Sequence, residues 1–183
     1  LITFTWHWFS PMYGHSKSFF RKNTEYDAWQ AVNEGTPEHE ALLSDLDHMA
    51  VLLRPFCEKG VPILWRPFHE MDGTWFWWGQ DHCTAEQYKA LCRLTVNRLR
   101  ERGVVNALYA YSPGTEADGD EARYLERYPG DDVIDLMGLD CYCWAPDADT
   151  LLIADYAAQL DKNLAMVCAV AKQHGKAAAL TET

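Results

Sequence analysis

Strand-like and helix-like segments alternate along the chain, and this alternation limits the possible folds more than any other feature of the sequence. Apolar runs typical of strands occur at residues 1–6, 61–68, 106–111, 133–139 and 176–183. Helix-like segments lie between them, at residues 36–60, 84–103, 120–128 and 150–173. Such alternation is typical of an α/β fold with a parallel sheet.

Capping residues mark the starts of two of these helices. Thr36 precedes Pro37, which places a capping hydroxyl before a proline at the first helical position. The segment 84–87 has the spacing of a capping box. Pro55 should kink or break the first helix. Residues 7–35 are polar and aromatic, and we expect a long loop there with room for a short helix.

Charge and hydropathy argue against several classes of partner. Lys and Arg total 16 and Asp and Glu total 27, which gives a net charge of −11. An acidic chain without a basic cluster argues against nucleic acid and against anionic membrane surfaces. No apolar run reaches the roughly 18 residues of a membrane span. No GxGxxG pattern follows a strand, which disfavours a nucleotide-binding sheet.

Polar residues gather where the expected strands end. The set consists of His7, His69, Glu70, Ser112, Asp140, Tyr142 and Glu182. In a (β/α)8 TIM barrel, this rim carries the active site. A complete barrel needs about 250 residues, so five of its eight units fit this chain. We therefore expect residues 1–183 to be one partial barrel, truncated inside a strand at both ends. Such a fragment, with an open sheet edge, should be poorly stable or inactive alone.

Two of these rim residues are glutamates, Glu70 and Glu182. If their side chains face each other across the barrel mouth, they form the carboxylate pair that glycoside cleavage requires. One carboxyl must be protonated to donate to the leaving oxygen, and the other must be ionised to attack the anomeric carbon. The competing structural interpretation is an ion pair, for instance between Glu70 and Arg66.

Other chemistries have weaker support in the sequence. A metal site could in principle gather His7, His69, Glu70 and Asp140, but no HxH or HxxxH spacing is present. Ser112 lacks the GxSxG elbow of a nucleophilic serine.

Aromatic and cysteine residues leave alternatives open. Three Trp and one Phe fall within residues 75–78, and such rings either stack on sugars or pack in the core. Six cysteines show no zinc-binding spacing. Cys141 and Cys143 lie two apart on a strand-like segment, so we expect both to be buried small hydrophobes that point away from the site. Disulfides remain possible, but their pairing cannot be read from the sequence.

One run of residues points to a known family. Trp65-Arg-Pro-Phe-His-Glu-Met-Asp-Gly-Thr-Trp-Phe-Trp-Trp-Gly79 strongly resembles the signature of glycoside hydrolase family 26, the β-mannanases. Four further segments match in order: Thr5-Trp-His7 with Pro11, Tyr109-Ala-Tyr-Ser-Pro113, Asp135-Leu-Met-Gly-Leu-Asp-Cys-Tyr142 and Leu180-Thr-Glu-Thr183. These resemble the third, fifth, sixth and seventh strands of that family's (β/α)8 barrel, so strands three to seven are expected here.

The resemblance also implies roles for residues. Glu70 matches the acid/base and Glu182 the nucleophile of a retaining mechanism. His69, beside the acid, would orient it, and Trp75 would stack on sugars next to the scissile bond. The remaining implied pocket residues are His7, Asp140 and Tyr142, the last hydrogen-bonded near the nucleophile.

Two further positions, Arg66 and Gly114, bear on the comparison with this family. We infer that Arg66 shares a face with Glu70 and helps to hold a carboxylate ionised. Gly114 departs from the family pattern, where a side chain such as Asn is expected.

The function implied by the resemblance is retaining endo-β-1,4-mannanase activity by double displacement, without metal or cofactor. The alternatives are a β-1,3-xylanase or mixed-linkage β-glucanase of the same family, and a non-catalytic carbohydrate-binding barrel. A β-mannan polymer is too large to enter a cell, so we expect an extracellular, monomeric protein.

Overall fold

The computed structural model describes residues 1–12, 17–144 and 150–183. Five parallel strands form one sheet in the order β1-β2-β3-β4-β5, so the strands follow one another in space as they do in the sequence. The strands are β1 (Ile2–Trp6), β2 (Ile63–Pro67), β3 (Ala107–Tyr111), β4 (Leu136–Asp140) and β5 (Ala177–Glu182).

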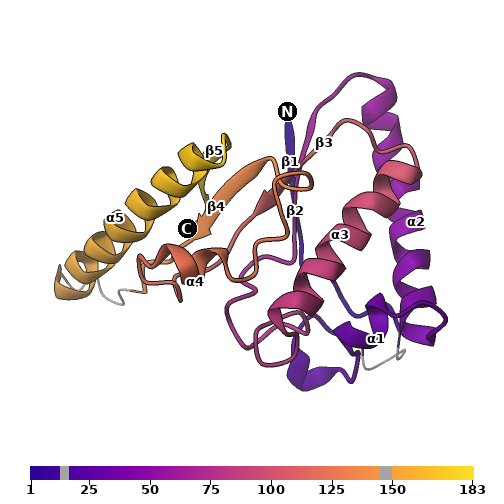
Figure 1. The fold of residues 1–183 in the computed structure, drawn as a ribbon, viewed down its shortest axis with the longest axis horizontal. Coiled ribbons are helices and arrows are strands. Elements are labelled where there is room, and N and C mark those ends of the chain that lie inside the picture. Colours follow the sequence, from indigo (N-terminus) through magenta and orange to yellow (C-terminus); the bar gives the residue numbers. More distant parts are fainter. Residues whose placement is uncertain (13–16, 145–149) are drawn as a thin grey trace.

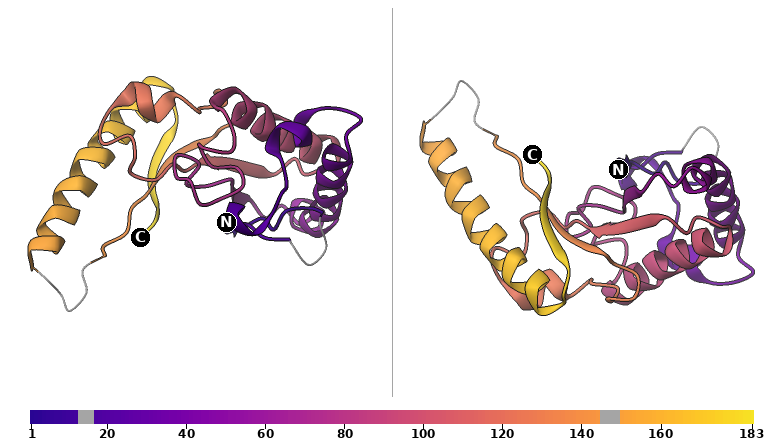
Figure 2. Two further views of the ribbon diagram at one scale, coloured as in Figure 1. Left: turned by 90° about the horizontal axis from the view of Figure 1, so that it is seen from below. Right: turned by 90° about the horizontal axis from the view of Figure 1, so that it is seen from above.

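Helices connect the strands on the outer side of the sheet. They are α1 (Ala28–Val32), α2 (Pro37–Glu58), α3 (Ala85–Glu101), α4 (Glu121–Leu125) and α5 (Thr150–Gln173), and a 3-10 turn lies at Arg21–Asn23. Figures 1 and 2 show α2 and α3 at one end of the molecule, beside β1 to β3, and α5 at the other end, beside β4 and β5. The sheet curls between them, which is the arrangement of an incomplete (β/α)8 barrel.

The predicted helix starts are confirmed by their caps. The Thr36 hydroxyl accepts a hydrogen bond from the backbone of His39, with Pro37 at the first helical position. The capping box of Thr84 and Gln87 is complete, with both reciprocal hydrogen bonds present. Pro55 does not break α2, since the helix continues through it to Glu58. The helix then ends within one turn of this proline.

The core is dominated by large aromatic side chains. Trp8, Phe68, Trp77 and Trp78 are fully buried, and the rings of Trp8 and Phe68 stack at 5.1 Å between centroids. The core-packing interpretation therefore holds for most of the 75–78 run. Only Trp75 in this run is exposed, with 41% of its surface accessible.

The cysteine expectation is half right. Cys141 is buried, but Cys143 is exposed and Cys141 lines the main cavity. Both follow β4 rather than lying in it, because that strand ends at Asp140 and strand alternation no longer applies. All six cysteines are free thiols.

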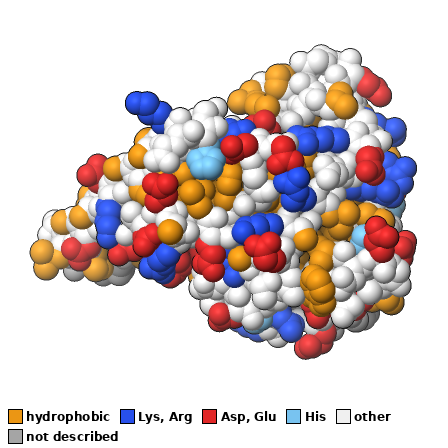
Figure 3. All heavy atoms as spheres, viewed as in Figure 1, with side chains coloured by type: hydrophobic (Ala, Val, Ile, Leu, Met, Phe, Trp, Pro, Cys, Tyr) orange, Lys and Arg blue, Asp and Glu red, His pale blue; other side chains and the backbone are white. Residues whose placement is uncertain are grey.

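Charges of both signs are mixed over the face shown in Figure 3, where Asp and Glu side chains lie among Lys and Arg. Within the described ranges, no helix combines the length and the hydropathy needed to cross a bilayer.

Candidate active site

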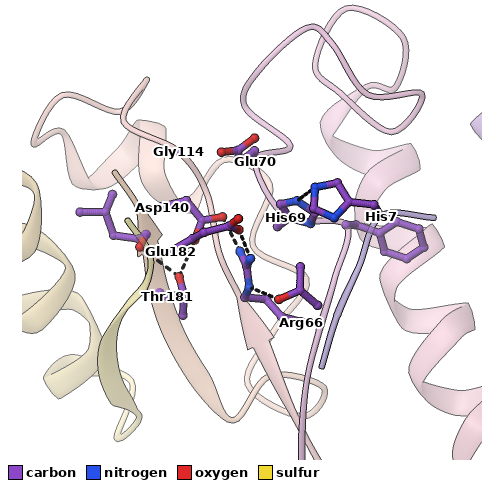
Figure 4. Close-up of polar contacts among 12 residues, drawn as sticks. His7, Arg66, His69, Glu70, Gly114, Asp140, Thr181 and Glu182 are labelled. Atoms are coloured by element: carbon purple, nitrogen blue, oxygen red, sulfur yellow. Dashed lines mark hydrogen bonds and ion pairs between the residues drawn. The ribbon is translucent and has the colours of Figure 1, made fainter. Parts of the chain in front are cut away.

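The predicted site residues meet at one end of the sheet. A cavity of about 720 Å³ opens there, at the carboxyl ends of the strands. Its lining includes seven of the eight residues that the sequence singled out: His7, His69, Glu70, Trp75, Asp140, Tyr142 and Glu182. The eighth, Arg66, lies beneath the cavity and holds two of the carboxylates in place (Figure 4).

Strand register explains why Arg66 reaches these carboxylates. Arg66 pairs with Thr5 across β1 and β2, and neighbours in register share a face of the sheet. Its Nε donates to the Thr5 hydroxyl over 3.3 Å. On the far side, an irregularity in the β4–β5 pairing sets Asp140 opposite Glu182. Gly138 leaves room for this arrangement, since a Cβ there would meet the Thr181 hydroxyl at 2.6 Å.

The guanidinium of Arg66 donates to both Asp140 and Glu182. Arg66 is almost completely buried, so it needs these partners to remain charged inside the protein. The expectation that Arg66 supports an ionised carboxylate is thus met at Glu182, but the alternative ion pair with Glu70 is wrong. Glu70 lies three residues beyond the end of β2, after a turn that removes it from the strand face.

Glu70 sits on a tight turn at the cavity wall. Phe68 and Glu70 both have left-handed backbone, with φ of 52° and 50°. The Glu70 amide donates to the Ser112 carbonyl over 2.8 Å, which fixes the turn to the end of β3. The indole nitrogen of Trp75 donates to Glu70 Oε2 over 3.0 Å. Left-handed backbone at two non-glycine residues is a strained arrangement, and such strain is concentrated at functional sites.

The two glutamates have opposite electrostatic surroundings. Burial raises the pKa of Glu70, and repulsion from Glu182 and Asp72 adds to it, while the Trp75 hydrogen bond opposes the shift. Burial also disfavours ionisation of Glu182, but hydrogen bonds from Tyr142 and Arg66 outweigh it and leave its pKa lowered. Environments that separate the pKa values of two carboxyls are a mark of an acid and its partner base or nucleophile.

A histidine pair forms another wall of the cavity. Nε2 of His69 lies 3.3 Å from Nε2 of His7, so one ring donates and the other accepts. Burial, together with the charges of Arg66 and His7, lowers the pKa of His69 to about 3. His69 is therefore neutral at ordinary pH. The indole nitrogen of Trp78 donates to the backbone carbonyl of His69 over 2.8 Å, which ties the residue before Glu70 to the Trp-rich loop.

Asp140 completes the buried charges. Burial raises its pKa to about 7, although the Arg66 charge and a hydrogen bond from the Thr181 hydroxyl, 2.7 Å long, oppose the shift. Two carboxyls, those of Asp140 and Glu182, thus share one guanidinium, and Glu70 lines the same cavity without binding it. Such an arrangement favours holding a proton on the carboxyl that has no cationic partner, which is Glu70.

The sequence analysis missed the aromatic wall of the cavity. Phe19 and Phe20 line it from the 7–35 segment, together with Phe76. The Trp77 amide donates to the Phe19 carbonyl over 3.1 Å, which brings this segment beside the Trp-rich loop. The high aromatic content of the 7–35 segment was the available signal. Other lining residues not anticipated are Thr115, Glu116, Trp144 and Gln159.

The metal-site alternative does not fit the geometry. Asp140 accepts a hydrogen bond from Arg66, and Glu70 accepts one from Trp75. Within residues 1–12, 17–144 and 150–183, no group of three or more His, Cys, Asp or Glu side chains is arranged to hold a metal ion.

Known proteins share this sequence and this fold. The model of glycosyl hydrolase family 26 matches residues 1–180. A mannan endo-1,4-β-mannosidase of Bifidobacterium adolescentis is 45% identical over 126 residues, which is 67% of this chain and 12% of that protein.

Solved structures agree with the sequence relatives. A family 26 β-mannanase of Bacteroides ovatus superimposes with a TM-score of 0.82 at 40% identity, over 99% of this chain and 50% of that one. The catalytic domain of an endo-β-1,4-mannanase of Bacillus sp. JAMB-750 gives a TM-score of 0.85 at 36% identity, over 99% of this chain and 46% of that one. This chain spans half or less of the length of each of these three proteins. Because the family model covers nearly the whole chain, the protein belongs to glycosyl hydrolase family 26.

Proposed function

We propose that this site hydrolyses β-1,4-mannan with retention of configuration, with Glu70 as the acid/base and Glu182 as the nucleophile. The observation that carries the proposal is the contrast between the two glutamates. Glu182 is held ionised by Arg66 and Tyr142, whereas the pKa of Glu70 is raised in the same cavity. An ionised nucleophile and a protonated acid are what the first step of double displacement needs.

The reaction would proceed in two balanced steps. In the first, the Glu70 carboxyl donates its proton to the glycosidic oxygen, a carboxylate oxygen of Glu182 bonds to the anomeric carbon, and the aglycone leaves as an alcohol. In the second, Glu70 takes a proton from water, the oxygen of that water bonds to the anomeric carbon, and Glu182 leaves as a carboxylate. Two inversions at one carbon give net retention.

Mannan is the proposed polymer because the three similar proteins described above are β-mannanases. The half-exposed ring of Trp75 lies beside Glu70, where a flat aromatic face can stack on a sugar next to the scissile bond. The neutral His69 and its partner His7 offer hydrogen bonds to sugar hydroxyls without placing a charge there. Since such a polymer does not enter cells, we also propose an extracellular site of action.

A non-catalytic carbohydrate-binding barrel is the alternative of a different class. It would need the aromatic wall but not the paired carboxylates, and it gives no reason for a buried guanidinium that holds Glu182 ionised. That contrast favours catalysis over binding alone.

The decisive experiment is reducing-sugar release by the protein at its full natural length. The substrates are β-mannan, galactomannan, mixed-linkage β-glucan and β-1,3-xylan, compared at equal enzyme concentration. Release from the mannans is the expected result. Release from another polymer would keep the mechanism and overturn the substrate, whereas no release by a folded protein would favour the binding barrel.

The stereochemical part of the proposal has its own test. Proton NMR of the earliest products should show the β anomer. An α anomer that appears first would overturn the retaining mechanism.

A further inference from the structure

Asp72 is a mostly buried carboxylate that the proposed reaction does not use. It lies two residues after Glu70, on the same turn, but its side chain points to a different segment, the β3–α4 loop. Its Oδ1 accepts the Gly114 amide over 2.7 Å, and its Oδ2 accepts the Glu116 amide over 3.2 Å. One carboxylate thus binds two amides of a loop more than 40 residues away.

The loop that Asp72 binds is itself a wall of the cavity. Gly114, Thr115 and Glu116 all line the space that Glu70 faces. The same loop is attached at its start, since the Glu70 amide donates to the Ser112 carbonyl over 2.8 Å. The acid-bearing turn and this loop are therefore joined at three points, and two of the three depend on the Asp72 side chain.

Gly114 leaves room for this contact. A Cβ at position 114 would lie 3.3 Å from Asp72 Oδ1, so the carboxylate would have to shift by a few tenths of an ångström. The glycine lets the carboxylate meet the backbone amide without that shift.

The attachment continues from the loop toward the nucleophile. The Asp140 amide donates to the Pro113 carbonyl over 2.9 Å, and the Cys141 amide donates to the Glu182 carbonyl over 2.9 Å. A series of backbone hydrogen bonds along the rim therefore connects the Glu70 turn to the end of β5. In this series, Asp72 is the side chain that holds the Glu70 turn against the loop.

We propose that Asp72 is a positioning residue, which holds Glu70 in its donating geometry by fastening the acid-bearing turn to the β3–α4 loop. This inference rests on the proposed function of Glu70. The strained backbone of Glu70, with φ of 50°, needs such support, because left-handed conformations persist only where the surroundings hold them. The charge of Asp72 also raises the pKa of Glu70 and so favours its protonated form.

The test compares two substrates that differ in their need for an acid. Mannan needs its leaving oxygen protonated, whereas an aryl β-mannoside with a 2,4-dinitrophenyl leaving group does not. We expect Asp72→Ala in the full-length protein to lower kcat/KM on mannan about 100-fold, within the range that general acid catalysis contributes. The kcat/KM on the aryl substrate should fall about 5-fold or less, since this parameter reports the first step, which for that substrate needs the nucleophile but no acid.

A matched control keeps the comparison specific. Asp120 also caps backbone through its carboxylate, which accepts the Arg123 amide at the start of α4, away from the cavity lining. Asp120→Ala should leave the ratio of the two substrate activities at the parental value. If Asp72→Ala lowers both activities in the same proportion, or lowers neither, the positioning role is overturned. A parent that cleaves neither substrate would instead overturn the proposed function itself.

A second variant decides the matter if Asp72→Ala does not fold. Asp72→Asn keeps one acceptor for the loop and removes the negative charge. The charges of Asp72, Glu182 and Arg66 act on the Glu70 carboxyl. The other titratable groups that line its cavity are His7, His69, Glu116, Asp140, Cys141 and Tyr142. Loss of the Asp72 charge should lower the pKa of Glu70 and move the basic limb of kcat/KM to lower pH. Loss of one of the two acceptors should also lower kcat/KM on mannan more than on the aryl substrate. A parental ratio of the two substrate activities in Asp72→Asn would overturn the positioning role.

Discussion

Arg66 and Glu182 form an ion pair between residues 116 positions apart in the sequence, from the second and the fifth strand of the sheet. The pair sits under the cavity, where Arg66 also binds Asp140 (Figure 4). A nucleophilic carboxylate is useful only when ionised, and burial alone would raise its pKa. Hydrogen bonds from Tyr142 and from the Arg66 guanidinium together lower the pKa of Glu182, so the ion pair favours the ionised form that the proposed reaction needs.

Replacement of the nucleophile should separate turnover from binding. Glu182→Ala removes the oxygen that attacks the anomeric carbon, so we expect kcat on mannan to fall by at least about 1,000-fold. Oligosaccharide binding, measured by calorimetry, should stay within about 10-fold, because the aromatic wall is untouched. Glu86→Gln, at an exposed ion pair with Lys89 on α3, is the control. Parental turnover in Glu182→Ala would refute the assignment.

Removal of the guanidinium should shift the acidic limb of the pH profile. Arg66 lowers the pKa of Glu182, so Arg66→Met should raise it and move the acidic limb of kcat/KM to higher pH. The same change leaves Asp140 without its cation, and loss of a partner from a buried charge pair costs about 3–5 kcal/mol of unfolding free energy. The pH profile and urea unfolding measure the two effects. Arg66→Lys keeps the charge and should shift the limb less.

The hydrogen bond from the indole nitrogen of Trp75 should lower the pKa of Glu70. This hydrogen bond favours the ionised form of Glu70, so Trp75→Phe should raise the pKa of Glu70 and move the basic limb of kcat/KM to higher pH. A hydrogen bond of about 1 kcal/mol corresponds to a shift below one unit. Trp29→Phe, at an exposed ring on α1, is the matched control. A basic limb that moves to lower pH in Trp75→Phe would contradict the hydrogen-bond assignment.

The capping box of α3 should contribute measurable stability without affecting the site. Thr84→Ala removes the hydroxyl that accepts the Gln87 amide, and such N-cap losses cost about 1 kcal/mol. We expect a lower urea midpoint with an unchanged slope, and parental kcat on mannan. Thr84→Ser keeps the hydroxyl and should restore the midpoint. An altered kcat in Thr84→Ala would contradict this expectation, because it would show that the start of α3 affects the geometry of the cavity.

The fold was largely predictable because its local signals agree with one another. Apolar runs, the Thr36 and Thr84 caps and the alternation of elements all point to the same parallel sheet, and the structure has these elements within a few residues of the expected bounds. Pro55 was the exception, because the expected break of the helix did not occur there. Local propensity is a weak guide where the packing of a 22-residue helix holds the chain helical.

The candidate site was predictable in its members but not in its contacts. The position of Glu70 and Glu182 at strand ends follows from the sequence, whereas the partners of Arg66 depend on strand register and on the irregularity at Asp140. The approach of Phe19 to the Trp-rich loop is likewise a tertiary contact between segments without a shared local pattern. Sequence reasoning names residue types and chain positions, and long-range packing decides which of them touch.

The order of the strands has a consequence for how the site comes into existence. Glu70 and Glu182 belong to units at different places in the sheet, and each neighbouring pair of strands joins only across an intervening helix. Parallel pairing of this kind has high contact order, and chains of high contact order fold slowly. The Arg66–Glu182 contact therefore forms only once β5 has docked on the sheet. During refolding, recovery of activity should lag behind recovery of the helical circular dichroism signal. A partly folded chain then has both carboxylates but does not hold Glu182 ionised.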